Sequence, residues 1–327
     1  MKKSINDTEY VYTCAKIRAM ENRLPTRSKL ERLIDASDSE VGILIKELGF
    51  DSSSKLDDAA VKRLDSELRD IKKTLPNDDI VRIFTYQYDC NNIKMLLKCK
   101  SRGISAEGML FSCGSVSEED AFRAAESEDF SAYPKNMASA AREALTSFAS
   151  TGNPQTVDVL LDRACYLDML EASAMHETVN EWIKLKIDIT NALITLRLIR
   201  MGGVAAEDML SEMLLDGGSV ERSLFTESRV YGESELLRRL SKKGFSFVTD
   251  ALSRKERYTL GDAEREFDDF YMRKVKAAKF VPFGAEIVAA YIIALEYSIK
   301  NIRIILAGKE ASLDGDVIRG MLRESYV

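Results

Sequence analysis

The chain has 327 residues, of which 45% are apolar and 31% are charged, and its formal net charge is −6. This is the composition of a folded, charge-rich globular protein that is long enough for two or three domains. The acidic balance argues against a nucleic-acid-binding protein, because contacts to phosphates require a basic face.

Helix-forming residues dominate the long stretches between the five prolines and 17 glycines, so a mostly helical fold is predicted. The five cysteines lack CxxC spacing, and residues 1–13 lack the apolar core of a signal peptide. We therefore expect free thiols in a reducing cytoplasm. The longest apolar run, 287–295, is too short for the roughly 20 residues that span a bilayer, so no segment is expected to cross a membrane.

The first predicted helical segment covers residues 14–24 and 26–34. Its Ile17 and Arg18 repeat the apolar-then-basic pattern of Ile93 and Lys94 further along the chain. The segment is either a degraded copy of the later repeat or an unrelated helical region, and the sequence leaves both interpretations open.

The next predicted element is an amphipathic helix over residues 84–103. It places Asp89 and Asn92 three positions apart, and therefore on one face, among apolar residues. A carboxylate in such a setting can serve as a metal ligand or a general base, because burial raises its pKa.

The same pattern returns 99 positions later, which indicates an internal duplication. Asp188 and Asn191 repeat Asp89 and Asn92, and the following tail also repeats. In that tail, residues 205–210 match 105–110, and Gly218, Ser219 and Val220 match Gly114, Ser115 and Val116.

A third, weaker copy lies near residues 300–309, which resemble 91–100. Asn301 takes the place of Asn92, whereas Ser298 stands where an aspartate is expected. The helices predicted before the second and third copies each carry an apolar residue followed by an aspartate, at Asp162 and Asp268.

Three helical repeat domains are therefore predicted, over residues 1–120, 121–227 and 228–327. Each consists of a helical hairpin and a short tail, and the spacing permits either a closed ring or an open solenoid.

We interpret the aspartate–asparagine pairs as structural. No histidine accompanies them, and a catalytic or metal-binding pair seldom occurs twice. Buried polar side chains are usually hydrogen-bonded, and here the expected partners are backbone groups of the neighbouring helix or tail. The pairs and Asn301 thus form a predicted structural signature of the repeat.

Other chemical motifs are missing from the sequence. It lacks the phosphate-binding GxxxxGK[ST] pattern as well as GxGxxG and GxSxG, and its single histidine, His176, lies in a polar stretch. We expect no catalytic residue, cofactor, metal or small-molecule substrate. The basic runs 238–245 and 253–258 are interpreted as solvated helix faces, with a local contact for an acidic partner as the alternative.

Several segments, in order, resemble the C subunit of archaeal-type and bacterial V-type ATPases, which is known as the d subunit in eukaryotic vacuolar ATPases. The likeness runs from residues 10–34 to residues 312–324. Between these ends, the segments that carry it are 86–103, 157–173, 182–203, 217–225 and 280–309.

The resemblance implies an all-α, funnel-shaped protein of three pseudo-symmetric helical-hairpin domains. It also implies a non-catalytic rotor adaptor, peripheral on the cytoplasmic side of a membrane, which joins the central-stalk subunits D and F to the membrane rotor ring of c/K subunits. The tails around Gly114, Ser115, Gly218 and Ser219 are the candidate stalk or ring contacts. The alternatives are a free-standing helical-repeat scaffold that binds other proteins, and a metal-dependent hydrolase using Asp89 and Asp188.

Overall fold

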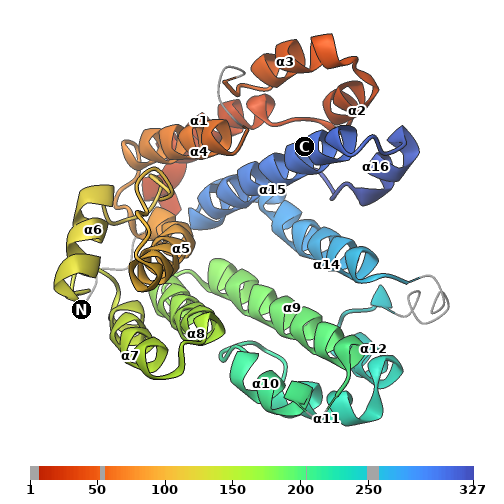
Figure 1. Ribbon diagram of the computed structural model, residues 1–327. Coiled ribbons are helices and arrows are strands. Elements are labelled where there is room, and N and C mark those ends of the chain that lie inside the picture. Colours follow the sequence, from red (N-terminus) through yellow and green to blue (C-terminus); the bar gives the residue numbers. More distant parts are fainter. Residues whose placement is uncertain (1–6, 52–55, 204, 249–257) are drawn as a thin grey trace. The chain divides into compact units, whose positions relative to one another are not determined.

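The computed structural model describes residues 7–51, 56–203, 205–248 and 258–327 (Figure 1). These ranges contain helices and connecting segments without any β-strand, which confirms the predicted all-α class. The predicted basic run 253–258 lies, except for Tyr258, outside these ranges.

The chain divides by its contacts into two compact units. The first unit joins both ends of the chain, Met1–Val81 with Glu256–Val327, and the second comprises Arg82–Lys255. This division does not address the three repeats expected over 1–120, 121–227 and 228–327, which stay a prediction.

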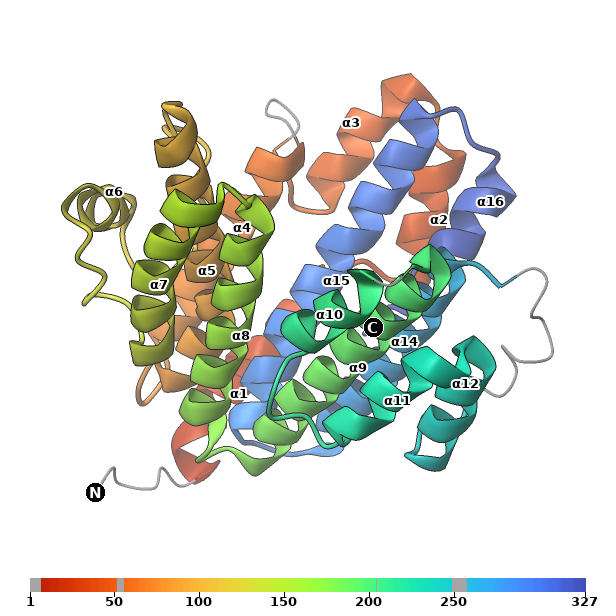
Figure 2. The ribbon, with the colours of Figure 1, turned by 60° about the horizontal axis from the view of Figure 1, so that its bottom comes forward.

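The first unit is built around one long helix, α15 (Ala285–Glu310). Helices α1, α2, α4, α14 and α16 all pack against α15, and α2 and α16 run beside it in both ribbon views (Figures 1 and 2). The other bounds in this unit are η1 (Asp7–Tyr10), α1 (Val11–Met20), η2 (Glu21–Arg23), α2 (Arg27–Asp35), α3 (Asp38–Glu47), α4 (Leu56–Lys72), α14 (Leu260–Val275), η3 (Lys276–Phe280) and α16 (Gly315–Met321).

The apolar run 287–295 forms the buried middle of α15, where every residue is at most 2% exposed. A helix that is apolar on all sides is stable in water only when other helices surround it. Within the described ranges, no helix is both long enough and apolar enough to span a bilayer.

The second unit continues from helix α5 (Asp79–Arg102), which begins in the first unit. Helix α9 packs against α8, α10, α11 and α12, whereas α7 packs chiefly along α8. The other bounds are α6 (Glu118–Ser127), α7 (Lys135–Thr151), α8 (Pro154–Ser173), α9 (Glu177–Met201), α10 (Ala205–Met213), α11 (Arg222–Tyr231) and α12 (Glu233–Lys242).

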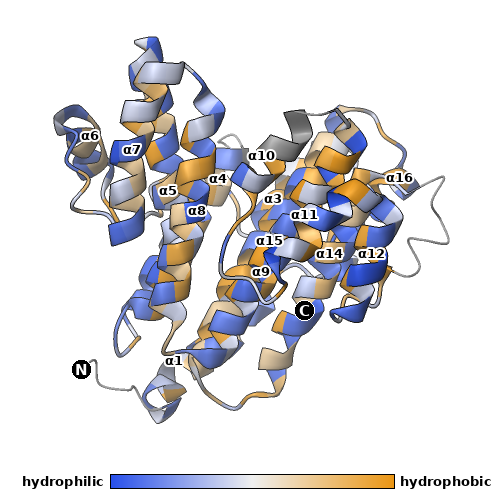
Figure 3. Ribbon diagram, turned by 90° about the horizontal axis from the view of Figure 1, so that it is seen from below, coloured by the Kyte–Doolittle hydropathy of each residue, from blue (hydrophilic) through white to orange (hydrophobic). Residues whose placement is uncertain are grey.

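The turn between α7 and α8 shows how the local sequence sets a hairpin. Gly152 ends α7 with a φ of 64°, a left-handed conformation that glycine adopts without a steric cost. Asn153 then caps α8 by accepting a hydrogen bond from the Gln155 N–H, and Pro154 occupies the first turn, where no N–H is needed. Polar and apolar stretches alternate along α8, as expected for an amphipathic helix (Figure 3).

A buried polar network joins α4 to α15 in the first unit. Arg63 contacts the Glu67 carboxylate at 3.3 Å, and the Tyr291 hydroxyl donates a hydrogen bond to the same carboxylate. The Arg63 guanidinium also donates to the Leu48 carbonyl and lies 4.5 Å from the Phe50 ring centroid. Burial and the Glu67 carboxylate raise the pKa of Tyr291, so the phenol stays protonated and remains a donor.

We predict that Tyr291→Phe lowers the free energy of unfolding by about 1–3 kcal/mol, because it removes a hydrogen-bond donor from a buried carboxylate. Urea unfolding followed by circular dichroism measures the loss. Tyr12→Phe is the matched control, since Tyr12 is 71% exposed and its hydroxyl has access to water. Equal stability of Tyr291→Phe and the parent would show that the bond contributes nothing to folding.

Candidate functional site

In the second unit, Asp89 and Asn92 of α5 bind the irregular tail that follows this helix. Asn92 exchanges two hydrogen bonds with the backbone of Phe111: its Nδ2 donates to the carbonyl at 2.9 Å, and its Oδ1 accepts from the N–H at 2.8 Å. Asp89 Oδ1 accepts from the N–H groups of Ser115 at 2.9 Å and Val116 at 3.2 Å, while the Ser115 hydroxyl donates to Oδ2. Both side chains are almost fully buried.

The second copy has the same arrangement on α9. Asn191 exchanges two hydrogen bonds, of 2.9 and 2.8 Å, with the carbonyl and N–H of Leu215. Asp188 accepts from the N–H groups of Ser219 and Val220, each at 3.0 Å. We call each set of an aspartate, an asparagine and the tail backbone that they bind a tail clamp.

The third copy, on α15 in the first unit, keeps the asparagine half of the clamp. Asn301 donates to the carbonyl of Arg323 at 3.0 Å and accepts from its N–H at 2.8 Å. Ser298, at the aspartate position, instead donates its hydroxyl hydrogen to the Ala294 carbonyl of its own helix at 2.7 Å.

Two carboxylates of α14 hold this third tail as well. Asp269 accepts from the Glu324 N–H at 2.6 Å, and Asp268 accepts from the Arg323 guanidinium at 3.1 Å. Asp268 also binds Tyr297 and Lys300 of α15. The sequence singled out Asp268 but missed Asp269, for which the adjacent Asp–Asp pair was the available signal.

The glycine in each of the first two tails leaves room for the carboxylate. A Cβ atom at Gly114 would overlap the Asp89 carboxylate, and one at Gly218 would overlap that of Asp188. Neither glycine has a positive φ, so the backbone conformation alone would permit other residues. Close approach to the carboxylate is therefore the reason for glycine at both positions.

Gly114, Ser115, Gly218 and Ser219, predicted as stalk or ring contacts, thus belong to the tail clamps. The serine side chains lie at exposed positions, although their N–H groups are engaged. Contact between these residues and a partner stays a prediction.

The Asp188 carboxylate lies in surroundings that disfavour charge. Burial raises the pKa of Asp188, and the N–H groups of Val220 and Ser219 partly offset the shift by stabilising the ionised form. In a comparable way, Asp168 of α8 accepts from the Met137 and Asn136 N–H groups at the start of α7, and burial raises its pKa. These acids act as acceptors for backbone donors.

Two ion pairs connect α5 with α8. Lys94 Nζ lies 2.5 Å from Asp162 Oδ1, and Lys98 Nζ lies 2.5 Å from Asp158 Oδ1. All five cysteines are free and buried, which agrees with the predicted free thiols.

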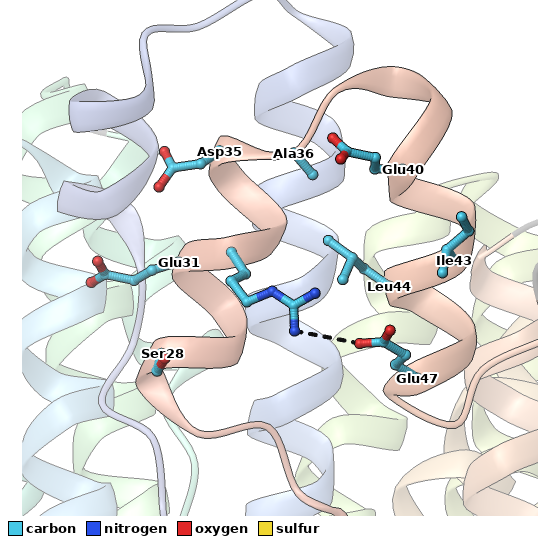
Figure 4. Close-up of a pocket in the computed structure, with 9 residues that line it drawn as sticks. Ser28, Glu31, Asp35, Ala36, Glu40, Ile43, Leu44 and Glu47 are labelled. Atoms are coloured by element: carbon cyan, nitrogen blue, oxygen red, sulfur yellow. Dashed lines mark ion pairs between the residues drawn. The ribbon is translucent and has the colours of Figure 1, made fainter.

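A groove of about 510 Å³ lies between α2 and α3 in the first unit (Figure 4). Its acids do not converge on one point: Glu31 and Asp35 point away from α3, Asp35 pairs with Arg319 of α16, and Glu47 lies 3.5 Å from Arg32. Glu40 instead caps α3 through Ser37. The groove therefore lacks the converging ligands that a metal ion requires.

A second cavity, of about 560 Å³, is lined by residues of both charges around Arg63 and Glu67. Both of these side chains already bind partners within the chain. Throughout the described ranges, no group of three or more His, Cys, Asp or Glu side chains is placed to hold a metal ion.

Comparison with known families accounts for nearly the whole chain. Residues 13–321 match the family described as ATP synthase (C/AC39) subunit. The chain belongs to this family. The resemblance recognised in the sequence is thereby confirmed.

The C/AC39 chain is similar to named relatives over most of its length. It is 26% identical to the C subunit of the A-type ATP synthase of Methanocaldococcus jannaschii, over 98% of this chain and 88% of the relative. The corresponding protein of Methanosarcina mazei is 23% identical, over 98% and 94%. The C subunit of the V-type sodium ATPase of Enterococcus hirae is 25% identical, over 78% of each chain.

We predict that Gly218→Ala destabilises this C/AC39 protein by about 1–3 kcal/mol, because the new Cβ forces the Asp188 carboxylate or the tail to move. Thermal and urea unfolding measure the change. Gly42→Ala is the matched control: Gly42 lies exposed in α3 with open space around it, so alanine should leave stability unchanged or raise it by up to about 1 kcal/mol. Equal effects of the two substitutions would contradict the close-approach argument.

The Asp188 carboxyl also gives a pH-dependent prediction. Its pKa is raised above the ordinary 3.8, so the folded chain binds this proton more tightly than the unfolded chain. Its contribution to stability is therefore greatest below pH 3.8 and declines as the pH rises through the raised value. Asparagine does not titrate, so the stability difference between the parent and Asp188→Asn should shrink with rising pH. Urea unfolding of both proteins across this range tests the sign, and a difference that grows with pH would contradict it.

Proposed function

We propose that the protein is a non-catalytic rotor adaptor of a rotary A- or V-type ATPase. In this role it joins the central-stalk subunits D and F to the membrane rotor ring of c/K subunits, and it lies peripherally on the cytoplasmic face. The observation that carries the proposal is the family match across residues 13–321, together with relatives named as the C subunit of A-type ATP synthases and of a V-type sodium ATPase.

The internal bracing of the helices supports a mechanical role. The tail clamps on α5 and α9 and the ion pairs between α5 and α8 fix segments that would otherwise move under load. A protein that transmits torque must resist such local movement, and buried, fully paired polar groups provide that resistance because breaking them exposes unsatisfied donors.

The clamp geometry also favours this role over a hydrolase that uses Asp89 and Asp188. Both carboxylates are buried, and each accepts at least two backbone N–H hydrogen bonds. A general base must instead accept a proton from a bound substrate or from water at hydrogen-bonding distance. These carboxylates are committed to the tails.

The proposal includes three repeat domains, over residues 1–120, 121–227 and 228–327, arranged as a funnel-shaped socket. Asp89, Asn92, Asp188, Asn191 and Asn301 are its structural signature. Each of these domains contains one long helix whose asparagine binds the backbone of the following tail. The exposed Ser115 and Ser219 would present the first two tails to the stalk or the ring.

Reconstitution tests the proposed function directly. The purified protein should bind a D–F stalk pair and should co-sediment with ring-containing membranes. In a complex assembled without it, ATP hydrolysis by the soluble sector should continue while ion movement stops. Binding to neither partner, or full coupling in its absence, would refute the adaptor role and favour a free-standing helical-repeat scaffold.

A further inference from the structure

The segment from Lys276 to Gly284, which connects α14 to α15 and includes η3, exposes an aromatic side chain. Phe280 is 90% exposed, more than any other large apolar side chain in the described ranges. Pro282, two positions further along the chain, is also exposed. We call this segment the 276–284 loop.

The backbone of the 276–284 loop is held in place from α1. The Arg18 guanidinium donates to the carbonyls of Ala278 at 2.8 Å and Val281 at 3.0 Å, on either side of Phe280. The Cys14 sulfur lies 3.5 Å from both the N and the O of Gly284. Phe280 is thus presented on an ordered backbone, so a binding partner would lose little free energy in ordering the loop.

The segment that carries Phe280 is itself rich in cations. Residues 271–285 contain four cations and no acid, and the acids Asp269 and Glu286 lie just outside this range. Glu324 lies near two of these cations, 3.4 Å from Arg273 and 2.6 Å from Lys276. Lys279, next to Phe280, lies over the Tyr326 ring at 4.8 Å. Partial burial and the charge of Lys276 lower the pKa of Lys279, whereas the nearby Glu21 opposes this shift.

We infer that the 276–284 loop binds the surface of an anionic lipid bilayer, with Phe280 entering the boundary between headgroups and acyl chains and Lys279 facing the headgroup phosphates. An exposed aromatic ring beside cations suits this boundary, where apolar burial and attraction to anionic lipids act together. A stable protein interface needs about 800 Å² on each partner around a central apolar cluster, which one protruding phenylalanine beside a lysine does not supply. The inference does not depend on the rotor role.

Vesicle binding of the full-length protein tests the inference. Flotation is measured with vesicles of phosphatidylcholine alone and with vesicles that also contain phosphatidylglycerol, at low and high salt. The parent should bind the anionic vesicles several-fold more strongly, and salt should weaken this binding. Phe280→Ala should lower the partition coefficient about tenfold, and Lys279→Gln about fivefold.

Two further variants distinguish insertion of the Phe280 side chain into the bilayer from nonspecific binding of the protein to vesicles. Ile43→Ala removes an apolar side chain that is 61% exposed on α3, and it should bind vesicles like the parent. Phe280→Trp should show a blue shift of its emission on anionic vesicles, against the constant signal of the buried Trp182. Because Phe280 is so exposed, its variants should fold like the parent, which circular dichroism verifies.

Three results would overturn the inference: equal binding to neutral and anionic vesicles, parent-like binding by Phe280→Ala, or unchanged emission from Phe280→Trp. Binding only to vesicles that contain the c/K subunits of the rotor ring would also overturn it, because the binding partner would then be a protein. A negative vesicle result leaves the reconstitution test of the rotor role unaffected, so the two proposals can fail separately.

Discussion

The hydrogen bonds between side chains of the long helices and the backbones of the following tails are the interaction on which the repeat depends. An irregular segment cannot satisfy its own N–H and C=O groups as a helix does, so buried groups in it need partners elsewhere. Asn92, Asn191 and Asn301 each serve both groups of one tail residue. Each amide side chain thereby supplies the two hydrogen bonds that one residue would otherwise make to neighbouring backbone in a regular element.

The aspartates bind further N–H groups of the first two tails, but burying a carboxylate removes it from water, which is unfavourable. An amide in place of Asp188 would offer one oxygen acceptor, whereas the carboxylate offers two, one for each of the N–H groups of Ser219 and Val220. Burial raises the pKa of this acid, because removing the charged form from water is unfavourable. The hydrogen bonds from Ser219 and Val220 offset this cost only in part, although hydrogen bonds to an ionised acceptor are stronger than those between neutral groups.

The sequence predicted the all-α class and named the aspartate and asparagine of both complete clamps, because helical periodicity and a duplicated spacing are local patterns. It could not give their partners. Asn92 binds Phe111, 19 residues away, and Asn191 binds Leu215, 24 residues away, so the path of each irregular tail decides the contact. Phe280 also escaped notice, since only the fold determines that this phenylalanine is exposed rather than buried like Phe267.

In the third copy, the aspartate of the helix and the glycine of the tail are replaced together, as expected if the glycine is needed only to accommodate the carboxylate. Gly114 and Gly218 each lie three residues after the tail residue that the asparagine binds, Phe111 or Leu215. In the third copy, the residue three positions after Arg323 is Tyr326, which is buried, and the aspartate position holds Ser298. Without a carboxylate to accommodate, a small residue is no longer required at this position of the tail. The Glu324 N–H instead donates to Asp269 on the preceding helix α14, so the third tail also binds a carboxylate, which comes from a different helix.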